Sequence, residues 1–147
     1  MREIEYRGKD LPNVMWIYGS YFMHITRTPC PMGDSIKPED KQATIIQDSF
    51  SDWNMPRNMV ARAVREETVG QYIGIKDRNG KKIFEGDILQ AGGRIFVVKY
   101  FSKYTRFALS DNFTPDKLPM CIRLMDNMEI IGNVYDNPGL LKRVSYE

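Results

Sequence analysis

The chain has few of the residues that cross-link proteins or bind metals. Its 147 residues include two cysteines, Cys30 and Cys121, and one histidine, His24. The cysteines form no CxxC pair and neither lies near His24, so the sequence predicts no structural metal site and no cofactor. Two isolated thiols fit a reducing compartment, where a disulfide is not expected.

Long apolar runs are also missing, so we expect no membrane-spanning segment and no membrane partner. The opening MREIEYRGKD has no apolar core of the kind that signal peptides carry, which favours a cytoplasmic location. Apolar residues make up 42% of the chain and charged residues 27%, the composition of an ordinary globular protein. The length suits one domain or a domain with a subdomain.

The net charge is only +2, which by itself does not indicate a polyanionic partner. The charges are unevenly distributed, however. The segment 76–106 holds eight basic and three acidic residues, so it carries +5 while the rest of the chain carries −3.

The segment from Thr68 to Gln90, TVGQYIGIKDRNGKKIFEGDILQ, has the strongest structural signals. Two β-prone runs flank Asp77-Arg78-Asn79-Gly80, and Asn-Gly predicts a hairpin with a type I′ turn, which needs φ > 0 at both central residues. A second corner is expected at Glu85-Gly86-Asp87, where Gly86 supplies φ > 0 and Asp87 binds turn amides.

Short strands between Gly, Pro and Asn turns are predicted along most of the chain, with few helical turns. The aromatic run from Val14 to Thr28 is predicted to be a hairpin that turns at Gly19-Ser20, and Glu66 to Val69 a single helical turn. The predicted strands are Glu3–Arg7, Met59–Arg65, Arg94–Phe101, Arg106–Ser110, Met120–Leu124 and Glu129–Tyr135. The pattern of Lys41–Phe50 fits a helix or a strand, and a strand is favoured. We therefore expect a mainly β protein whose C-terminal half is barrel-like.

Two blocks of sequence resemble a known family. ETVGQYIGIKDRNGKKIFEGDIL, from Glu67 to Leu89, and EIIGNVYDNPGLL, from Glu129 to Leu141, are similar to the YopX-type proteins of bacteriophages and prophages. The resemblance implies a phage or prophage protein, in the host bacterial cytoplasm, with a β-rich N-terminal region over 1–67 and an SH3-like barrel over 68–147. It implies no enzyme activity.

Other candidate chemistry has simpler explanations. His24 has no nucleophile or carboxylate placed on it by the sequence, which favours a structural or surface role. Glu85 and Asp87 could bind a metal or act as acid and base, but turn chemistry explains EGD at a strand corner. The glycines of this region match no phosphate-binding loop. We therefore expect no catalytic residues.

Basic and aromatic residues interleave after the predicted hairpin, a pattern that can pair phosphates with cations and stack bases on rings. Strand alternation would place Lys99, Phe101 and Lys103 on one face. The alternative is a barrel strand with core aromatics and lysines that protect a sheet edge. The candidate nucleic-acid-binding residues are Lys81, Lys82, Arg94, Lys99, Phe101, Lys103 and Arg106.

The sequence thus leaves two functions open for a non-catalytic accessory protein. The first is a module that binds DNA or RNA, with DNA favoured. The second is a protein-interaction module that binds a host or phage protein or forms a homo-oligomer through exposed strands and aromatics.

Overall fold

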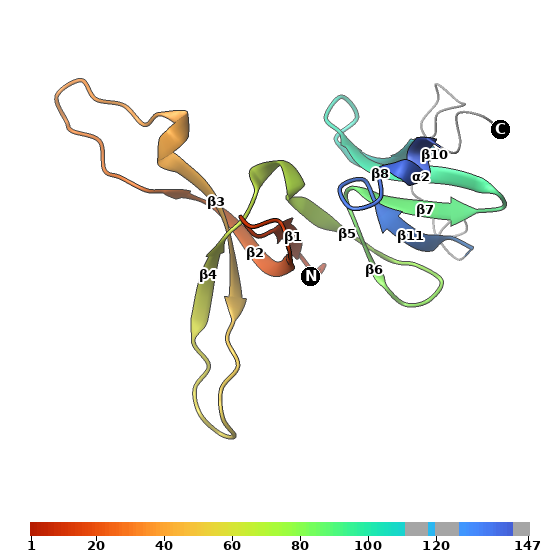
Figure 1. Ribbon diagram of the computed structural model, residues 1–147, viewed down its shortest axis with the longest axis horizontal. Coiled ribbons are helices and arrows are strands. Elements are labelled where there is room, and N and C mark those ends of the chain that lie inside the picture. The colour runs from red at the N-terminus through yellow and green to blue at the C-terminus, as the bar shows by residue number, and fades with distance from the viewer. Residues whose placement is uncertain (111–117, 120–126, 143–147) are drawn as a thin grey trace. The chain divides into compact units, whose positions relative to one another are not determined.

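The computed structural model describes residues 1–110, 118–119 and 127–142, and these fold as a mainly β protein with antiparallel sheets (Figure 1). The chain divides into two compact units. The N-terminal unit is Ile4–Gly70, and the C-terminal unit combines Met1–Glu3 with Gln71–Glu147. Cys121 and the strand predicted at Met120–Leu124 lie outside the described residues.

The N-terminal unit contains a sheet with the strand order β4-β3-β2-β1. Its core is a cluster of Ile17, Ala43, Ile45 and Val64, with Tyr21 and Val69 packed against it. Its elements are β1 (Tyr6–Lys9), β2 (Trp16–Ile25), η1 (Pro38–Asp40), β3 (Lys41–Asp48), β4 (Met59–Ala63) and η2 (Glu66–Thr68). The helical turn predicted at Glu66 is confirmed as η2.

The hairpin predicted at Gly19-Ser20 is wrong, because Trp16–Ile25 is one continuous strand, β2. The first part of β2 pairs with β1 and the second part, from Ser20, pairs with β3. At Gly19 the backbone of β3 comes so close that a Cβ would lie 2.1 Å from the Ile46 carbonyl oxygen. The glycine therefore permits a close approach of two strands and does not mark a turn.

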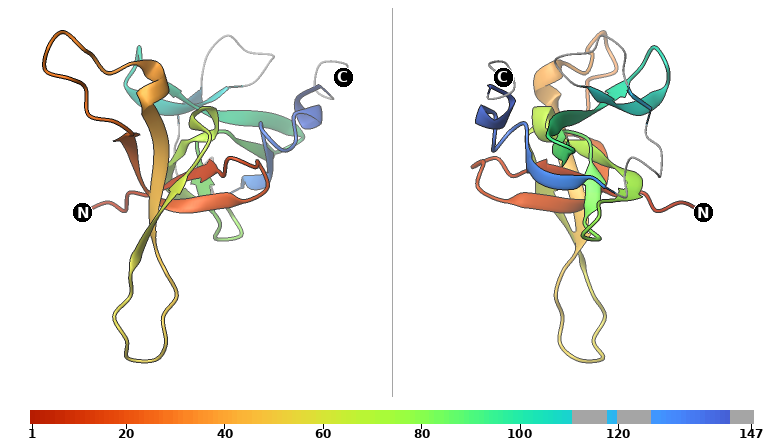
Figure 2. Two further views of the ribbon diagram at one scale, coloured as in Figure 1. Left: turned by 60° about the vertical axis from the view of Figure 1, so that its left-hand side comes forward. Right: turned by 90° about the vertical axis from the view of Figure 1, so that its right-hand side faces the viewer.

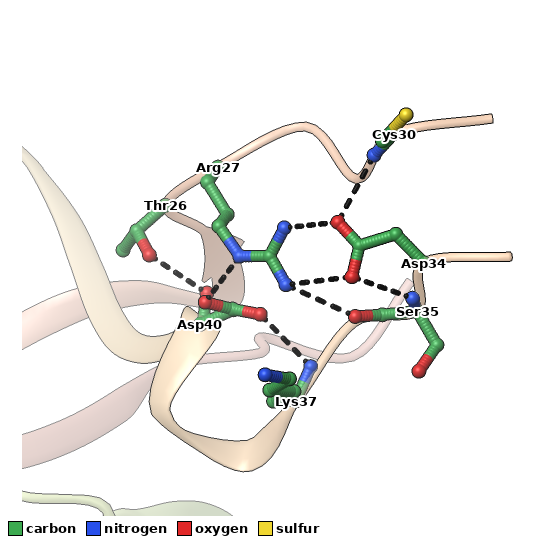
Figure 3. A network of polar contacts seen from close by, with 7 residues as sticks. All are labelled: Thr26, Arg27, Cys30, Asp34, Ser35, Lys37 and Asp40. Atoms are coloured by element: carbon green, nitrogen blue, oxygen red, sulfur yellow. Dashed lines mark hydrogen bonds and ion pairs between the residues drawn. The ribbon is translucent and has the colours of Figure 1, made fainter. Parts of the chain in front are cut away.

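The loop between β2 and β3 is fastened by one arginine (Figure 3). The Arg27 guanidinium donates to Asp34 at 2.7 Å and to Asp40 at 2.8 Å, and Asp34 in turn accepts the Cys30 amide. The hydrogen bond from Arg27 holds the pKa of the Asp34 carboxyl below its usual value. Because the carboxylates face a cation and backbone donors, the proline-rich loop before η1 adopts a defined path although it contains no strand or helix.

The C-terminal unit contains a β5–β6 hairpin and a five-stranded sheet with the order β10-β9-β8-β7-β11. One core cluster holds Ile83, Leu89, Phe96, Val98, Leu109 and Met128. Ile73 and Ile75 of β5 pack against it, so the hairpin and the sheet share a core. The elements are β5 (Gly70–Lys76), β6 (Lys82–Phe84), β7 (Asp87–Ala91), β8 (Arg94–Phe101), β9 (Arg106–Ser110), β10 (Leu118–Pro119), β11 (Glu129–Asn133) and α2 (Gly139–Lys142).

The expected mainly β class with few short helical turns is confirmed, whereas the described strands form no closed barrel. The turn at Asp77–Gly80 is present, since the Gly80 amide donates to the Asp77 carbonyl at 3.0 Å. Its predicted type I′ is wrong. Gly80 has φ 81°, but Asn79 is not among the non-glycine residues with positive φ. No described helix is long and apolar enough to cross a membrane.

Candidate nucleic-acid interface

The two corners predicted in the C-terminal unit, at Asp77–Gly80 and at Glu85–Asp87, are built by buried carboxylates that bind backbone amides. Asp77 Oδ1 accepts the amides of Asn79 and Lys81, each at 2.9 Å, and its Oδ2 accepts the Ile130 amide at 3.2 Å. Asp87, 2% exposed, accepts the Phe84 amide at 2.8 Å. Gly86 has φ 91°, as the turn chemistry predicts. These acids are therefore parts of the fold's framework.

Burial changes the proton affinity of one neighbouring acid. Glu85 lies half-buried between Phe84 and Gly86, and desolvation raises the pKa of its carboxyl. Within the described ranges, no three His, Cys, Asp or Glu side chains are grouped to hold a metal ion. His24 lies exposed on β2, with its ring 6.0 Å from that of Phe22.

The two sequence blocks meet in space. Strand β11 pairs with β7, so that Ile130 lies opposite Leu89 and Asn133 opposite Asp87. The Val134 amide donates to the Gly86 carbonyl at 2.9 Å, and the Tyr135 ring lies 3.1 Å from where a Gly86 Cβ would be. The two blocks therefore pair with each other as neighbouring strands, and the second block contacts the Gly86 corner of the first.

Asparagines complete the second block. Asn133 Oδ1 accepts the amides of Tyr135 and Asp136, and the Asn137 amide donates to the Asn133 carbonyl at 2.9 Å. A Cβ on Gly132 would lie 2.6 Å from Asn137 Oδ1, so the glycine makes room for this turn. The motif GNVYDNPG is explained by backbone hydrogen bonding in the turn that follows β11.

The structure separates the basic candidate residues into two groups at opposite ends of the five-stranded sheet. Arg94 begins β8 opposite Ala91, whereas Lys99 and Phe101 lie at the other end of β8. The seven residue steps from Arg94 to Phe101 span roughly 23 Å of strand. No single cluster of all seven candidates therefore exists.

The first group lies near the β5–β6 turn and is partly neutralised. The Arg78 amide donates to the Met128 carbonyl, and its guanidinium lies 3.4 Å from the Glu129 carboxylate. Glu129 pairs with Gln90, next to the turn that leads to Arg94. Lys81 is exposed at this end. Lys82 is half-buried, forms an ion pair with Glu3 and lies 5.4 Å from the Tyr72 ring centre.

The second group, which is Lys99, Phe101, Lys103 and Arg106, surrounds the β8–β9 turn, residues 102–105. We call this group, together with the turn, the β8–β9 tip. Phe101 lies opposite Arg106 and Lys99 opposite Ala108, so these side chains share one face of the sheet. Lys103 lies in the turn, so strand alternation does not place it on that face. Among the described residues, no ion pair involves Lys99, Lys103 or Arg106.

Tyr104 is the residue of the tip that was not among the predicted binding residues. It is 51% exposed, and two cations flank its ring, with Lys103 Nζ at 5.6 Å and Arg106 Cζ at 5.3 Å from the centroid. Tyr100, 46% exposed, packs edge-on against Phe107 with ring centres 5.2 Å apart. The sequence signal for Tyr104 is an aromatic residue inside a turn with basic neighbours.

Edge protection does not explain Lys99, because β8 has a partner on each side and is an inner strand. The prediction that aromatic residues of this strand are core is confirmed for Phe96, which is buried in the cluster. The residues from Lys99 to Arg106 lie beyond that core. They form an exposed surface of cations and aromatic rings.

The YopX protein family model matches residues 5–142. The chain belongs to the YopX family. No curated protein is significantly similar to it in sequence. Among solved structures, protein EF1440 from Enterococcus faecalis is similar to this YopX chain in fold, with a TM-score of 0.50 and 22% identity. The similarity covers 96% of this chain and 99% of that one.

Proposed function

We propose that this YopX-family chain is a phage- or prophage-encoded accessory protein without catalysis, which works in the host cytoplasm and binds nucleic acid through the β8–β9 tip. DNA is the favoured partner. The observation that carries the proposal is the exposed Tyr104 ring, which Lys103 and Arg106 both contact. Cations beside an exposed ring fit a phosphate backbone with adjacent bases.

Electrostatics support the same surface. From Ile88 to Ser110 the sequence has four basic residues and no acidic one. Three of the four, Lys99, Lys103 and Arg106, are exposed at one end of this segment. Because this segment has no acidic residue, a phosphate that approaches its cations meets no repulsion from a neighbouring carboxylate of the segment.

The expected salt dependence follows from three phosphate contacts. For duplex DNA the slope of log K against log salt is about −0.9 per contact, which gives roughly −2.7, and for a single strand roughly −2. Affinity for a duplex should therefore fall about 40-fold between 50 and 200 mM salt. The affinity for a single strand should fall less with salt, and stacking of its bases on Tyr104 should increase that affinity.

The test is fluorescence anisotropy with labelled single- and double-stranded oligonucleotides at both salt concentrations. Lys103→Glu should weaken binding by at least tenfold, and Lys81→Glu should change it little. The two variants lose the same charge on exposed residues of the same unit, so their difference reports position. Equal weakening by both variants, or no salt-dependent binding by the wild type, would overturn the assignment of the tip.

Stacking is tested separately at Tyr104. Replacing an aromatic stacking platform costs about 1–3 kcal/mol per base. Tyr104→Leu should therefore reduce single-strand affinity by roughly 5- to 150-fold while the salt slope stays the same. Tyr104→Phe, which keeps the ring, should bind like the wild type.

We also propose that the C-terminal unit is an SH3-like barrel in its complete form. The support is the core that β5 and β6 share with the five-stranded sheet, through Ile73, Ile75 and Ile83. The test is a search for nuclear Overhauser contacts from the backbone atoms of β10 and β11, the two edge strands of the five-stranded sheet, to further strands. A unit that stays open along both sheet edges would refute it.

A further inference from the structure

The β3–β4 hairpin of the N-terminal unit ends in a loop that displays large apolar side chains to solvent. In the loop 49–58, Trp53 is 97% exposed and Phe50 91% exposed, and Met59 at the start of β4 is 78% exposed. The loop, drawn in yellow, extends beyond β1 and β2 in both views of Figure 2. We call Phe50, Trp53, Met55 and Met59 the apolar tip.

The apolar tip is held in shape by its own hydrogen bonds. The Ser49 amide and hydroxyl both donate to the Asn58 carbonyl, at 2.7 and 2.8 Å. The Met55 amide donates to the Asp52 carbonyl at 3.1 Å, and the Ser51 hydroxyl to the Met55 carbonyl at 3.2 Å. An ordered loop that exposes an indole and a phenyl ring is prepared to bury them against a partner, because ordering costs have already been met.

The same unit has an apolar hollow at the base of this hairpin. The hollow is open to solvent, and its volume is about 490 Å³, within the roughly 300–1,000 Å³ of ligand pockets. Its lining comes from the turn before β2, from β2 and from β4: Asp10, Leu11, Pro12, Met15, Ile17, Ala61, Arg62 and Ala63. Leu11 and Met15 are exposed at its mouth.

The tip of one chain cannot fill the hollow of the same chain. The ladder from Ile46↔Ala61 to Asp48↔Met59 keeps the hairpin extended as far as Met59, two residues beyond the lining residue Ala61. The loop 49–58 then continues away from β1 and β2 (Figure 2). Large apolar side chains that fill the hollow must therefore come from another molecule.

We propose that two copies of this chain form a two-fold dimer in which the apolar tip of each enters the hollow of the other. The charges fit, because the tip carries Asp52 and Arg57, and the hollow presents Arg62 and Asp10. Each charge on one surface has an opposite charge available on the other. A two-fold axis makes the contact twice, which closes the assembly at a dimer.

The area is sufficient for a stable dimer. Phe and Trp bury about 150–250 Å² each, so two tips bury roughly 800 Å² of their own surface. The hollows, whose lining exposes much less surface, lose a smaller area. The total of roughly 1,000 Å² reaches the size at which a specific interface begins.

The experiment measures mass and Trp53 environment together. The chain has two tryptophans, so Trp16→Phe leaves Trp53 as the only indole. Light scattering after size exclusion should show the mass doubling with protein concentration. The Trp53 emission should shift to shorter wavelength over the same concentration range.

Three variants distinguish the contact from others. Trp53→Ser and Met15→Asp should each weaken the dimer by about 30-fold or more, as loss of a central anchor does. Mixing them should restore association, because one intact tip then meets one intact hollow. Met32→Ser, an exposed methionine of the β2–β3 loop, serves as control and should dimerise like the wild type.

Several outcomes would overturn the proposal. A monomer with solvent-exposed Trp53 at 200 µM would do so, a concentration about 200 times that at which a micromolar dimer is half formed. Dimerisation that Met15→Asp leaves unchanged would indicate a tip-to-tip contact. A Trp53 shift that appears with phosphatidylglycerol vesicles and not with concentration would assign the apolar tip to a lipid surface.

Discussion

Asp77→Ala should destabilise the C-terminal unit more than any other single change in the β5–β6 turn. The wild-type carboxylate accepts three backbone amides, two from the turn and one from Ile130 of β11. Hydrogen bonds to a charged group contribute about 1.5–3 kcal/mol each. The turn amides of Asn79 and Lys81 can rebond to water after the change, so each counts for about 1 kcal/mol, the net value of an ordinary hydrogen bond. The loss should therefore be about 3–5 kcal/mol.

The assay is native-state hydrogen exchange followed by mass spectrometry. A loss of 3–5 kcal/mol corresponds to an increase in exchange of about 100-fold or more wherever amides exchange by opening of this unit. Peptides from 71–110 should show it, while peptides from 4–70 report the other unit. Both tryptophans lie in the N-terminal unit, so their fluorescence gives a second reference.

Two further variants locate the effect in the carboxylate. Asp77→Asn keeps one acceptor oxygen and should cost about half as much. Arg78→Ala removes an exposed ion pair with Glu129 at 3.4 Å and should cost at most about 1 kcal/mol. The reasoning is refuted if Asp77→Ala changes exchange in 71–110 by less than tenfold, or if Arg78→Ala matches it.

Three other changes follow from the same contacts. Burial raises the pKa of the Glu85 carboxyl in the folded protein, so the stability of the fold is lost as pH rises through the folded pKa. Glu85→Gln should therefore raise the urea midpoint at pH 7 and have less effect at pH 4. Gly19→Ala, whose Cβ would meet the Ile46 carbonyl oxygen at 2.1 Å, should cost about 3 kcal/mol in urea unfolding followed by tryptophan fluorescence. Arg27 lowers the pKa of the Asp34 carboxyl, so the stability that this ion pair contributes is present above the ordinary pKa of 3.8 and is lost as pH falls through the folded pKa. Proteolysis of residues 28–38 should accelerate at that low pH in the wild type, and already at pH 7 in Asp34→Asn.

Local sequence signals located the turns but not their geometry. Asn79-Gly80 predicts a turn correctly, yet its type is set by Asp77, whose carboxylate captures the next amides and keeps Asn79 at negative φ. Gly19 suggests a break, yet the residue serves a close approach of β3 that only the folded sheet creates. In both cases the deciding contact is made by a group that propensity does not consider.

Strand pairing between distant segments limited the prediction of the site. The sequence places eight cations between residues 76 and 106, which suggests one patch. Antiparallel pairing of β7 with β8 and of β11 with β7 sends Arg94 and Lys103 to opposite ends of the sheet. Such register is decided by core packing across about forty residues of sequence, which no local window contains.

The β8–β9 hairpin shows how the fold can carry a charged surface without losing stability. Its inner residues Phe96, Val98 and Leu109 belong to the core, whereas Lys103 and Arg106 lie beyond it. The framework is fastened by the pairing of β7 with β11 and by the hydrogen bonds of Asp77 and Gly86 to backbone groups. Because Lys103, Tyr104 and Arg106 belong to neither core cluster, substitutions of these residues should change binding and leave the unfolding free energy within about 0.5 kcal/mol. Binding and stability are therefore separable in this unit, and a tip variant that lost both would place the binding surface elsewhere.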